Sequence, residues 1–156
     1  MLKKHEHVSA EHVCSGIGIP NIYDYLKTVE QIPESTETAE LIAAAKDRTA
    51  AIFNSAIDPK NPSALCAATV DTFVSILASE AGNLAVKVLA TGGIYIAGGV
   101  PLHILKVLEG PGFMTSFKRK GRFAELMEHI PVHIILTRAA LLGSAVYGLE
   151  TFKERA

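Results

Sequence analysis

The sequence predicts a helix-rich α/β fold with one short pair of parallel strands. Helical spacing of apolar residues fills most of the first ninety positions, and two short β-branched runs follow, at 94–97 and 132–137. The stretch between these runs is long and helical, so the connection implies a parallel pair joined by a right-handed crossover. Because parallel strands normally lie in larger sheets that are covered on both faces, we expect further strands outside these residues.

Four helices are expected before the first strand. Ser9 is placed to cap a short helix that ends at Cys14, and Pro20 fits the first turn of a second helix. An alanine-rich segment predicts a third, unbroken helix, and Asn61 with Pro62 suits the start of a fourth, apolar and central one. The expected helices cover 10–14, 21–30, 39–57 and 62–88, followed after the first strand by 101–108, 122–129 and 139–153.

Composition is that of an ordinary globular protein. The 156 residues are 49% hydrophobic and 20% charged, which favours a single domain spanning 1–156. A net charge of −1 gives no field that would gather nucleic acid or anionic lipid. The longest uncharged run, from Val88 to Leu105, contains two glycine pairs and Pro101, so it indicates a buried strand and turn rather than a membrane span.

The cysteines point to a reducing compartment. Cys14 and Cys66 have neither the spacing of a zinc site nor that of a disulfide framework, and no apolar stretch of signal-peptide length follows the basic N-terminus. We therefore expect a cytoplasmic protein with no metal site of its own.

One basic cluster runs from Lys118 to Arg122. It contains Lys118, Arg119, Lys120 and Arg122 and could bind phosphates or serve as a targeting patch. A solvated loop between two helices is the interpretation that we favour.

Six stretches in a fixed order carry a family resemblance. They are HVSAEHVCSG at 7–16, NIY at 21–23, AGNLA at 81–85, GGIYIAGGVP at 92–101, KGRF with IPV at 120–123 and 130–132, and LLGSA at 141–145. Each is weak alone, but together they cover almost the whole chain. The chain resembles the bacterial-type glucokinases of the actin-like ATPase superfamily, which implies a partial ribonuclease-H-like domain.

The same resemblance identifies motifs that this sequence does not contain. The family carries a DxGGTN-type phosphate loop, an Asn-Asp pair whose aspartate is the general base, and a GExGH-type sugar-binding segment. The chain therefore corresponds to the C-terminal part of the large lobe, without the N-terminal lobe. No catalytic residue is expected in this chain, and we predict that it does not phosphorylate glucose alone.

The resemblance also implies binding roles for five residues. Glu11 matches the glutamate that accepts hydrogen bonds from sugar hydroxyls, although the neighbouring His12 replaces an arginine common in relatives. Gly98 and Gly99 match the glycine pair on the adenosine side of the cleft. Gly92 and Gly93 are weaker nucleotide-binding candidates. Without the resemblance, Glu11 is a solvated surface residue and the glycines make turns.

The expected ligands follow from the parent reaction. They are glucose and ATP with Mg²⁺, the metal being held through the ATP phosphates and not by this chain. A homodimer is expected as well, because the missing strands would leave an open edge of the sheet. A non-catalytic sugar- or nucleotide-binding regulatory module derived from the kinase fold is the alternative.

Overall fold

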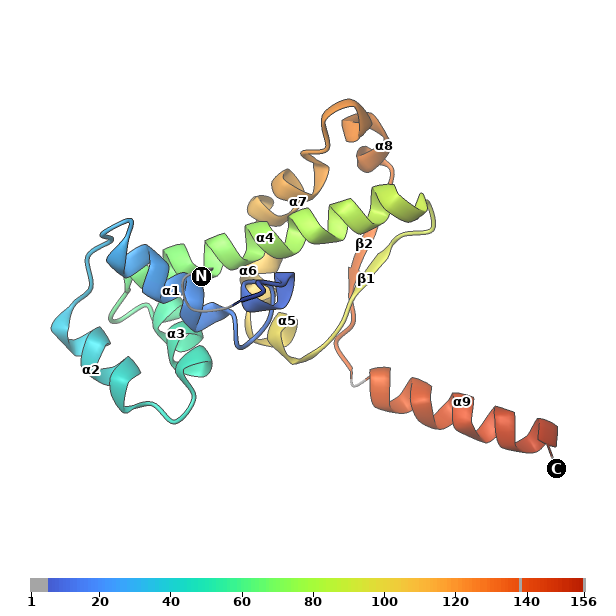
Figure 1. The fold of residues 1–156 in the computed structure, drawn as a ribbon, viewed down its shortest axis with the longest axis horizontal. Coiled ribbons are helices and arrows are strands. Elements are labelled where there is room, and N and C mark those ends of the chain that lie inside the picture. The colour runs from blue at the N-terminus through green and yellow to red at the C-terminus, as the bar shows by residue number, and fades with distance from the viewer. Residues whose placement is uncertain (1–5, 138, 156) are drawn as a thin grey trace.

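The computed structural model describes residues 6–137 and 139–155 (Figure 1). Helices dominate, and a two-stranded sheet follows the longest of them. The elements, in chain order, are η1 (Ala10–His12), α1 (Ile19–Thr28), α2 (Thr36–Ala44), α3 (Arg48–Ile57), α4 (Ala64–Val88), β1 (Ile94–Ile96), α5 (Gly99–His103), α6 (Leu105–Leu108), α7 (Pro111–Lys118), η2 (Gly121–Phe123), α8 (Ala124–Glu128), β2 (Val132–Ile134) and α9 (Ala139–Arg155).

Helix α4 is the centre of the hydrophobic core. It runs through the middle of the molecule, with α1 and α3 packed near its first half and α7 against its middle (Figure 1). Its start differs from the prediction, because Ser63 rather than Asn61 is the cap and accepts a 3.3 Å bond from the amide of Cys66. Among the described residues, α4 alone has the length and composition of a membrane span. Its packing against other helices is that of a core helix.

Helix α1 confirms the predicted second helix, and Pro20 lies in its first turn. Its buried side is spaced as a helix requires, with Ile19, Ile22, Tyr23 and Leu26 in the core. Tyr25, at helical spacing from Ile22 and Leu26 in the sequence, does not share that side. Tyr25 is 52% exposed, and its hydroxyl donates to Glu30 over 2.8 Å.

The predicted single helix over 39–57 is two helices, α2 and α3. Asp47 ends the continuity, because its carboxylate accepts from the amides of Thr49 at 2.9 Å and Ala50 at 3.1 Å. The first amides of a helix have no carbonyl partner within the helix, and a capping side chain accepts their hydrogen bonds instead. The break turns α3 so that Ile52 and Phe53 enter the core.

The sheet consists of β1 and β2, paired in parallel as predicted. Ile94 lies opposite Val132 and Ile96 opposite Ile134. Ile96 is buried, whereas Tyr95 points to the other face and stacks on His133 with ring centroids 4.8 Å apart. The helix-rich fold with a short parallel strand pair is therefore confirmed.

The connection between the strands contains more and shorter helices than predicted. The predicted helix over 101–108 divides into α5 and α6 at Ile104. Helix α7 begins at Pro111, in a stretch for which no helix was predicted, and its Phe113 and Phe117 are buried.

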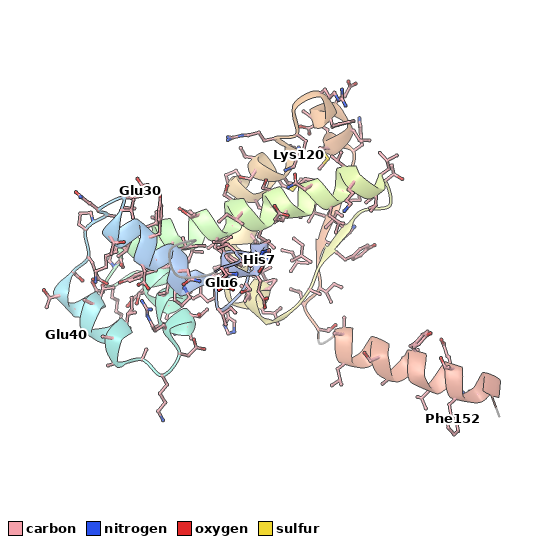
Figure 2. All side chains as sticks on the ribbon, in the orientation of Figure 1. Glu6, His7, Glu30, Glu40, Lys120 and Phe152 are labelled. Atoms are coloured by element: carbon pink, nitrogen blue, oxygen red, sulfur yellow. The ribbon has the colours of Figure 1, made fainter. Side chains whose placement is uncertain are left out.

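The basic cluster is only partly the solvated loop that we favoured, because two of its four side chains are anchored to the protein while Arg119 and Arg122 are exposed. The Lys120 ammonium donates to Ser79 O at 2.8 Å, Ser79 Oγ at 3.1 Å and Asn83 Oδ1 at 2.9 Å on α4 (Figure 2). Lys118 forms an ion pair with Glu128. A Cβ at Gly82 would come within 2.4 Å of Lys120 Cε and 2.6 Å of the Phe117 carbonyl oxygen, so glycine permits this close packing.

Helix α9 confirms the last predicted helix and extends away from the body of the molecule (Figure 1). Phe152 projects from it near the C-terminal end (Figure 2) and is 78% exposed.

Candidate functional site

Glu11 lies in η1, a single turn of 3₁₀ helix that is shorter than the predicted helix through Cys14. Ser9 is its N-cap residue, and the Ser9 amide donates to His12 Nδ1 over 3.2 Å. The Ser15 hydroxyl donates to the Glu11 carbonyl oxygen over 2.7 Å. The backbone of Glu11 is thus fixed on both sides, while its carboxylate remains exposed.

Two helices hold the segment that carries Glu11. From α1, the Asn21 amide Nδ2 donates to the His12 carbonyl oxygen at 3.0 Å, and from α3, Thr49 Oγ1 donates to the Gly16 carbonyl oxygen at 2.7 Å. Gly18 packs so closely on His12 that an added Cβ would lie 2.8 Å from backbone atoms of that residue. The position of Glu11 therefore depends on the packing of α1 and α3.

A pocket of about 470 Å³ opens beside this segment and brings Glu11 and Gly99 together. Its volume lies within the range of small-molecule sites. Residues from three segments of the chain line it: Glu11, Ser15, Gly16, Ile17, Asp47, Thr49, Ala50, Phe53, Gly99, Val100 and His103.

Gly98 and Gly99 join β1 to α5. Gly98 has φ +117° and ψ −177°, a conformation that glycine adopts readily and other residues rarely do. No atom lies within 4 Å of a Cβ built at Gly99, so the backbone there is open. Both glycines also line a second pocket of about 250 Å³, with Cys14 and Gly16 on its wall. The open backbone at this turn could be approached closely by a ligand.

Gly92 and Gly93 lie at the opposite end of β1 and line neither of these pockets. Gly93 has φ +113°, and a Cβ there would be 3.0 Å from the Pro131 carbonyl oxygen. Gly93 therefore allows the close approach of the segment that precedes β2. Gly92 is exposed, with nothing within 4 Å of a built Cβ.

Several wall residues of the larger pocket were not predicted from the sequence. Phe53 and His103 stack with ring centroids 6.3 Å apart and planes 14° from parallel. Asp47 reaches the wall through the break between α2 and α3. The stacked pair has no local sequence signal, because it forms only when residues of α3 and α5 meet in the folded chain. The break has one, since Asp47 is a good capping residue.

The cysteines are free thiols, Cys66 buried and Cys14 half-buried. Burial raises the pKa of Cys14, and the negative charge of Glu80 adds to the effect. Within the described part of the chain, no three His, Cys, Asp or Glu side chains group closely enough to hold a metal ion.

Comparisons with known proteins agree with the resemblance. The glucokinase family model matches residues 1–151. Glucokinase from Nostoc punctiforme is 36% identical over 94% of this chain, and glucokinase from Escherichia fergusonii is 33% identical over 93%. The crystal structure of a glucokinase from an Antarctic psychrotroph superimposes with a TM-score of 0.69 and 29% identity, covering 88% of this chain.

The chain is shorter than these relatives. It spans 46% of the Nostoc protein, 42% of the Escherichia protein and 39% of the crystallised chain. The match is nevertheless nearly continuous along the present sequence, in both sequence and fold. The chain therefore belongs to the glucokinase family.

Proposed function

We propose that this chain is the C-terminal, nucleotide- and sugar-binding portion of a glucokinase. The parent reaction is the transfer of the terminal phosphoryl group of ATP to glucose, giving ADP and glucose 6-phosphate. The observation that carries the proposal is the shared pocket, in which Glu11 and Gly99 meet although they lie far apart in the sequence.

Glu11 is proposed to bind the sugar. An ionised carboxylate accepts hydrogen bonds and suits a substrate rich in hydroxyl groups. The hydrogen bonds from Ser15, Asn21 and Thr49 to the Glu11–Gly16 backbone support this role, because a positioned acceptor loses less entropy on binding.

The turn at Gly98 and Gly99 is proposed to receive the nucleotide. Its open backbone offers close approach, and the exposed ring of His103, which stacks on the buried Phe53, offers an aromatic surface on which a base could lie. Gly92 and Gly93 are less suited to nucleotide contact, because they lie at the other end of β1; they stay as weaker candidates.

Mg²⁺ is proposed to be held through the ATP phosphates. The described residues fit this division, since they offer no grouped metal ligands. When bound, Mg²⁺ would neutralise the phosphate charge. This chain's own residues would bind and orient the two substrates, without supplying the base. The free thiols support a reducing, cytoplasmic setting as part of the same proposal.

A nucleotide-binding measurement on the isolated chain tests the proposal. Isothermal titration with ATP and Mg²⁺ is expected to detect binding that Gly99→Val abolishes, because the valine side chain would project into open space on the pocket wall. Gly112→Val is the matched control, since Gly112 also has open space but lies in α7, outside the pocket. Equal binding by both variants would contradict the assignment of the nucleotide to this turn.

A further inference from the structure

His12 closes an unusual helix cap beside Glu11. The amide of Ser9 donates to Nδ1 of the His12 ring over 3.2 Å, and the His12 amide donates to the Ser9 carbonyl oxygen over 3.1 Å. The amide of a residue that caps a helix has no carbonyl partner within that helix. A side chain three positions further on normally supplies the acceptor, most often a glutamate or a glutamine. In this chain an imidazole supplies it.

The bond from Ser9 also fixes which nitrogen of the His12 ring carries the proton. A backbone amide can only donate, so Nδ1 must offer its lone pair, and the proton of the neutral ring is on Nε2. The Ser9 hydroxyl lies 3.2 Å from the same nitrogen and, because it rotates, can turn its own proton toward it. His12 therefore acts as an acceptor, a role that a lysine or arginine side chain cannot fill.

His12 ties the same turn to α1. Its carbonyl oxygen accepts from Asn21 Nδ2 over 3.0 Å, so the residue is held by its ring on one side and by its backbone on the other. Ser9 and His12 are half-buried, whereas Glu11 between them is exposed. A single helical turn is not stable by itself, because it forms few bonds for the dihedral angles that it fixes. The direction of Glu11 therefore depends on the cap that spans it.

We propose that His12 is a positioning residue for the sugar contact, which holds Glu11 at the pocket by accepting the hydrogen bond of the Ser9 amide. The inference rests on the proposed function for the identity of the ligand at Glu11. Glu11 is one of the described residues that line the pocket of about 470 Å³, and His12 is not, so His12 acts through its neighbour. Without the acceptor, the Glu11 carboxylate would sample other directions, and binding a hydroxyl group would cost more ordering entropy.

A matched pair of substitutions isolates the acceptor. His12→Leu and His12→Asn both place an atom at the same number of bonds from the backbone as Nδ1. Only the asparagine offers an oxygen there that accepts a hydrogen bond. His7→Leu is the control, because His7 is an exposed histidine of the same N-terminal segment.

Amide hydrogen exchange of the isolated chain tests the cap without any ligand. The Ser9 amide reports the bond itself, and the Cys14 amide, which donates to the Ala10 carbonyl oxygen over 2.7 Å, reports the turn. We expect both to exchange about threefold to tenfold faster in His12→Leu, as the loss of one hydrogen bond predicts, and near the original rate in His12→Asn and His7→Leu. Unchanged exchange at either amide in His12→Leu would overturn the proposal, as would exchange in His12→Asn as fast as in His12→Leu.

Steady-state kinetics measure the effect on the substrate when residues 1–156 are joined to the part of Nostoc punctiforme glucokinase that lies outside the match. His12→Leu should raise the KM for glucose about threefold to tenfold and change kcat and the KM for ATP by less than about twofold. His12→Asn should restore the KM for glucose. A merely structural role would shift all three constants together, and that outcome would overturn the proposal.

Failure of this inference and failure of the proposed function give different results. If Glu11→Gln raises the KM for glucose and His12→Leu does not, the proposed function stands and the positioning role is overturned. If the joined protein does not phosphorylate glucose, the proposed function fails. The exchange of the Ser9 and Cys14 amides then still decides whether His12 holds the turn.

Discussion

The hydroxyl of Thr49 donates a 2.7 Å hydrogen bond to the carbonyl oxygen of Gly16, joining α3 to the segment that carries Glu11. This bond crosses 33 sequence positions and lies on the pocket wall. Because this hydrogen bond joins two segments that line the pocket, its removal should loosen the site before it unfolds the chain.

Thr49→Val keeps the shape of the side chain and removes the donor. We expect the free energy of unfolding to fall by about 0.5–1.5 kcal/mol, the usual contribution of one hydrogen bond. Urea denaturation measures it. Thr28→Val is the control, because Thr28 donates to Asp24 within its own exposed helix turn and should change stability less. Equal losses in the two variants would argue against a bridging role for Thr49.

The interruption at Asp47 illustrates what the sequence could and could not predict. Alanine-rich residues on both sides have helical propensity, so the pattern predicted one helix over 39–57. Asp47 is a good capping residue, but only tertiary packing decides whether the helix breaks there. The same limit applies to α7, which was not predicted although Pro111 suits the first turn of a helix.

Phosphorylation of glucose by the isolated chain should be undetectable. The phosphate loop and general base known from the resemblance are not in this sequence, and losing a general base typically costs 10²–10⁴-fold on its own. A coupled assay with glucose, ATP and Mg²⁺ tests this expectation. Turnover near ~10 s⁻¹, ordinary for an enzyme, would refute the assignment of catalytic parts to the missing portion.

Glu11 and Gly99 should affect the binding of different substrates when residues 1–156 are joined to the part of Nostoc punctiforme glucokinase that lies outside the match. Glu11→Gln should raise the KM for glucose more than that for ATP, because a charged acceptor contributes about 1.5–3 kcal/mol per hydrogen bond. Gly99→Val should raise the KM for ATP more. Steady-state kinetics with each substrate varied in turn measures both. A shift of the same constant by both variants would mean that the pocket binds a single substrate.

The pocket also shows which residues of the site could be predicted from the sequence and which could not. Glu11 and Gly99 were predicted from short motifs that carry the family resemblance, and both line one pocket in the structure. Phe53 and His103 also line that pocket and stack on each other, but neither lies in a sequence motif that predicts a place in the site. A contact between elements that are distant in the sequence produces no periodic pattern in it, so the residues that make such a contact are identified only from the structure.

Lys120 should stabilise the fold through its bonds to α4. Lys120→Met keeps much of the aliphatic stem and removes the three bonds to Ser79 and Asn83, so the free energy of unfolding should fall by about 1–3 kcal/mol. Arg119→Met is the control, because Arg119 is an exposed neighbour in the same basic cluster. Thermal or urea unfolding of both variants measures the difference. Equal stability would show that the Lys120 bonds are offset by the desolvation of its ammonium.

Without a partner, the isolated chain should self-associate as a two-fold dimer. The outer edge of β1 and the exposed apolar side chains of α9 are both open, and symmetric dimers are the commonest closed arrangement. The α9 side chains are Leu141, Leu142, Val146, Leu149 and Phe152. Burial of apolar surface is favourable by roughly 25 cal/mol per Å² before the entropy of association is subtracted. Dimerisation should therefore be weaker than docking of the missing portion, which offers strands as well as apolar area.

Sedimentation at micromolar concentration measures the dimer. Leu149→Asp should shift the chain toward monomer, while Ser144→Asp, on the other side of α9, should not. Adding the part of Nostoc punctiforme glucokinase that lies outside the match should dissociate the dimer, because that part and a second copy of the chain would bind the same surface. A cooperative, monodisperse monomer of 16.7 kDa would show that the chain hides this surface by itself. In that case α9 would pack against the body of the molecule in solution, and its apolar face would not be open for a second copy.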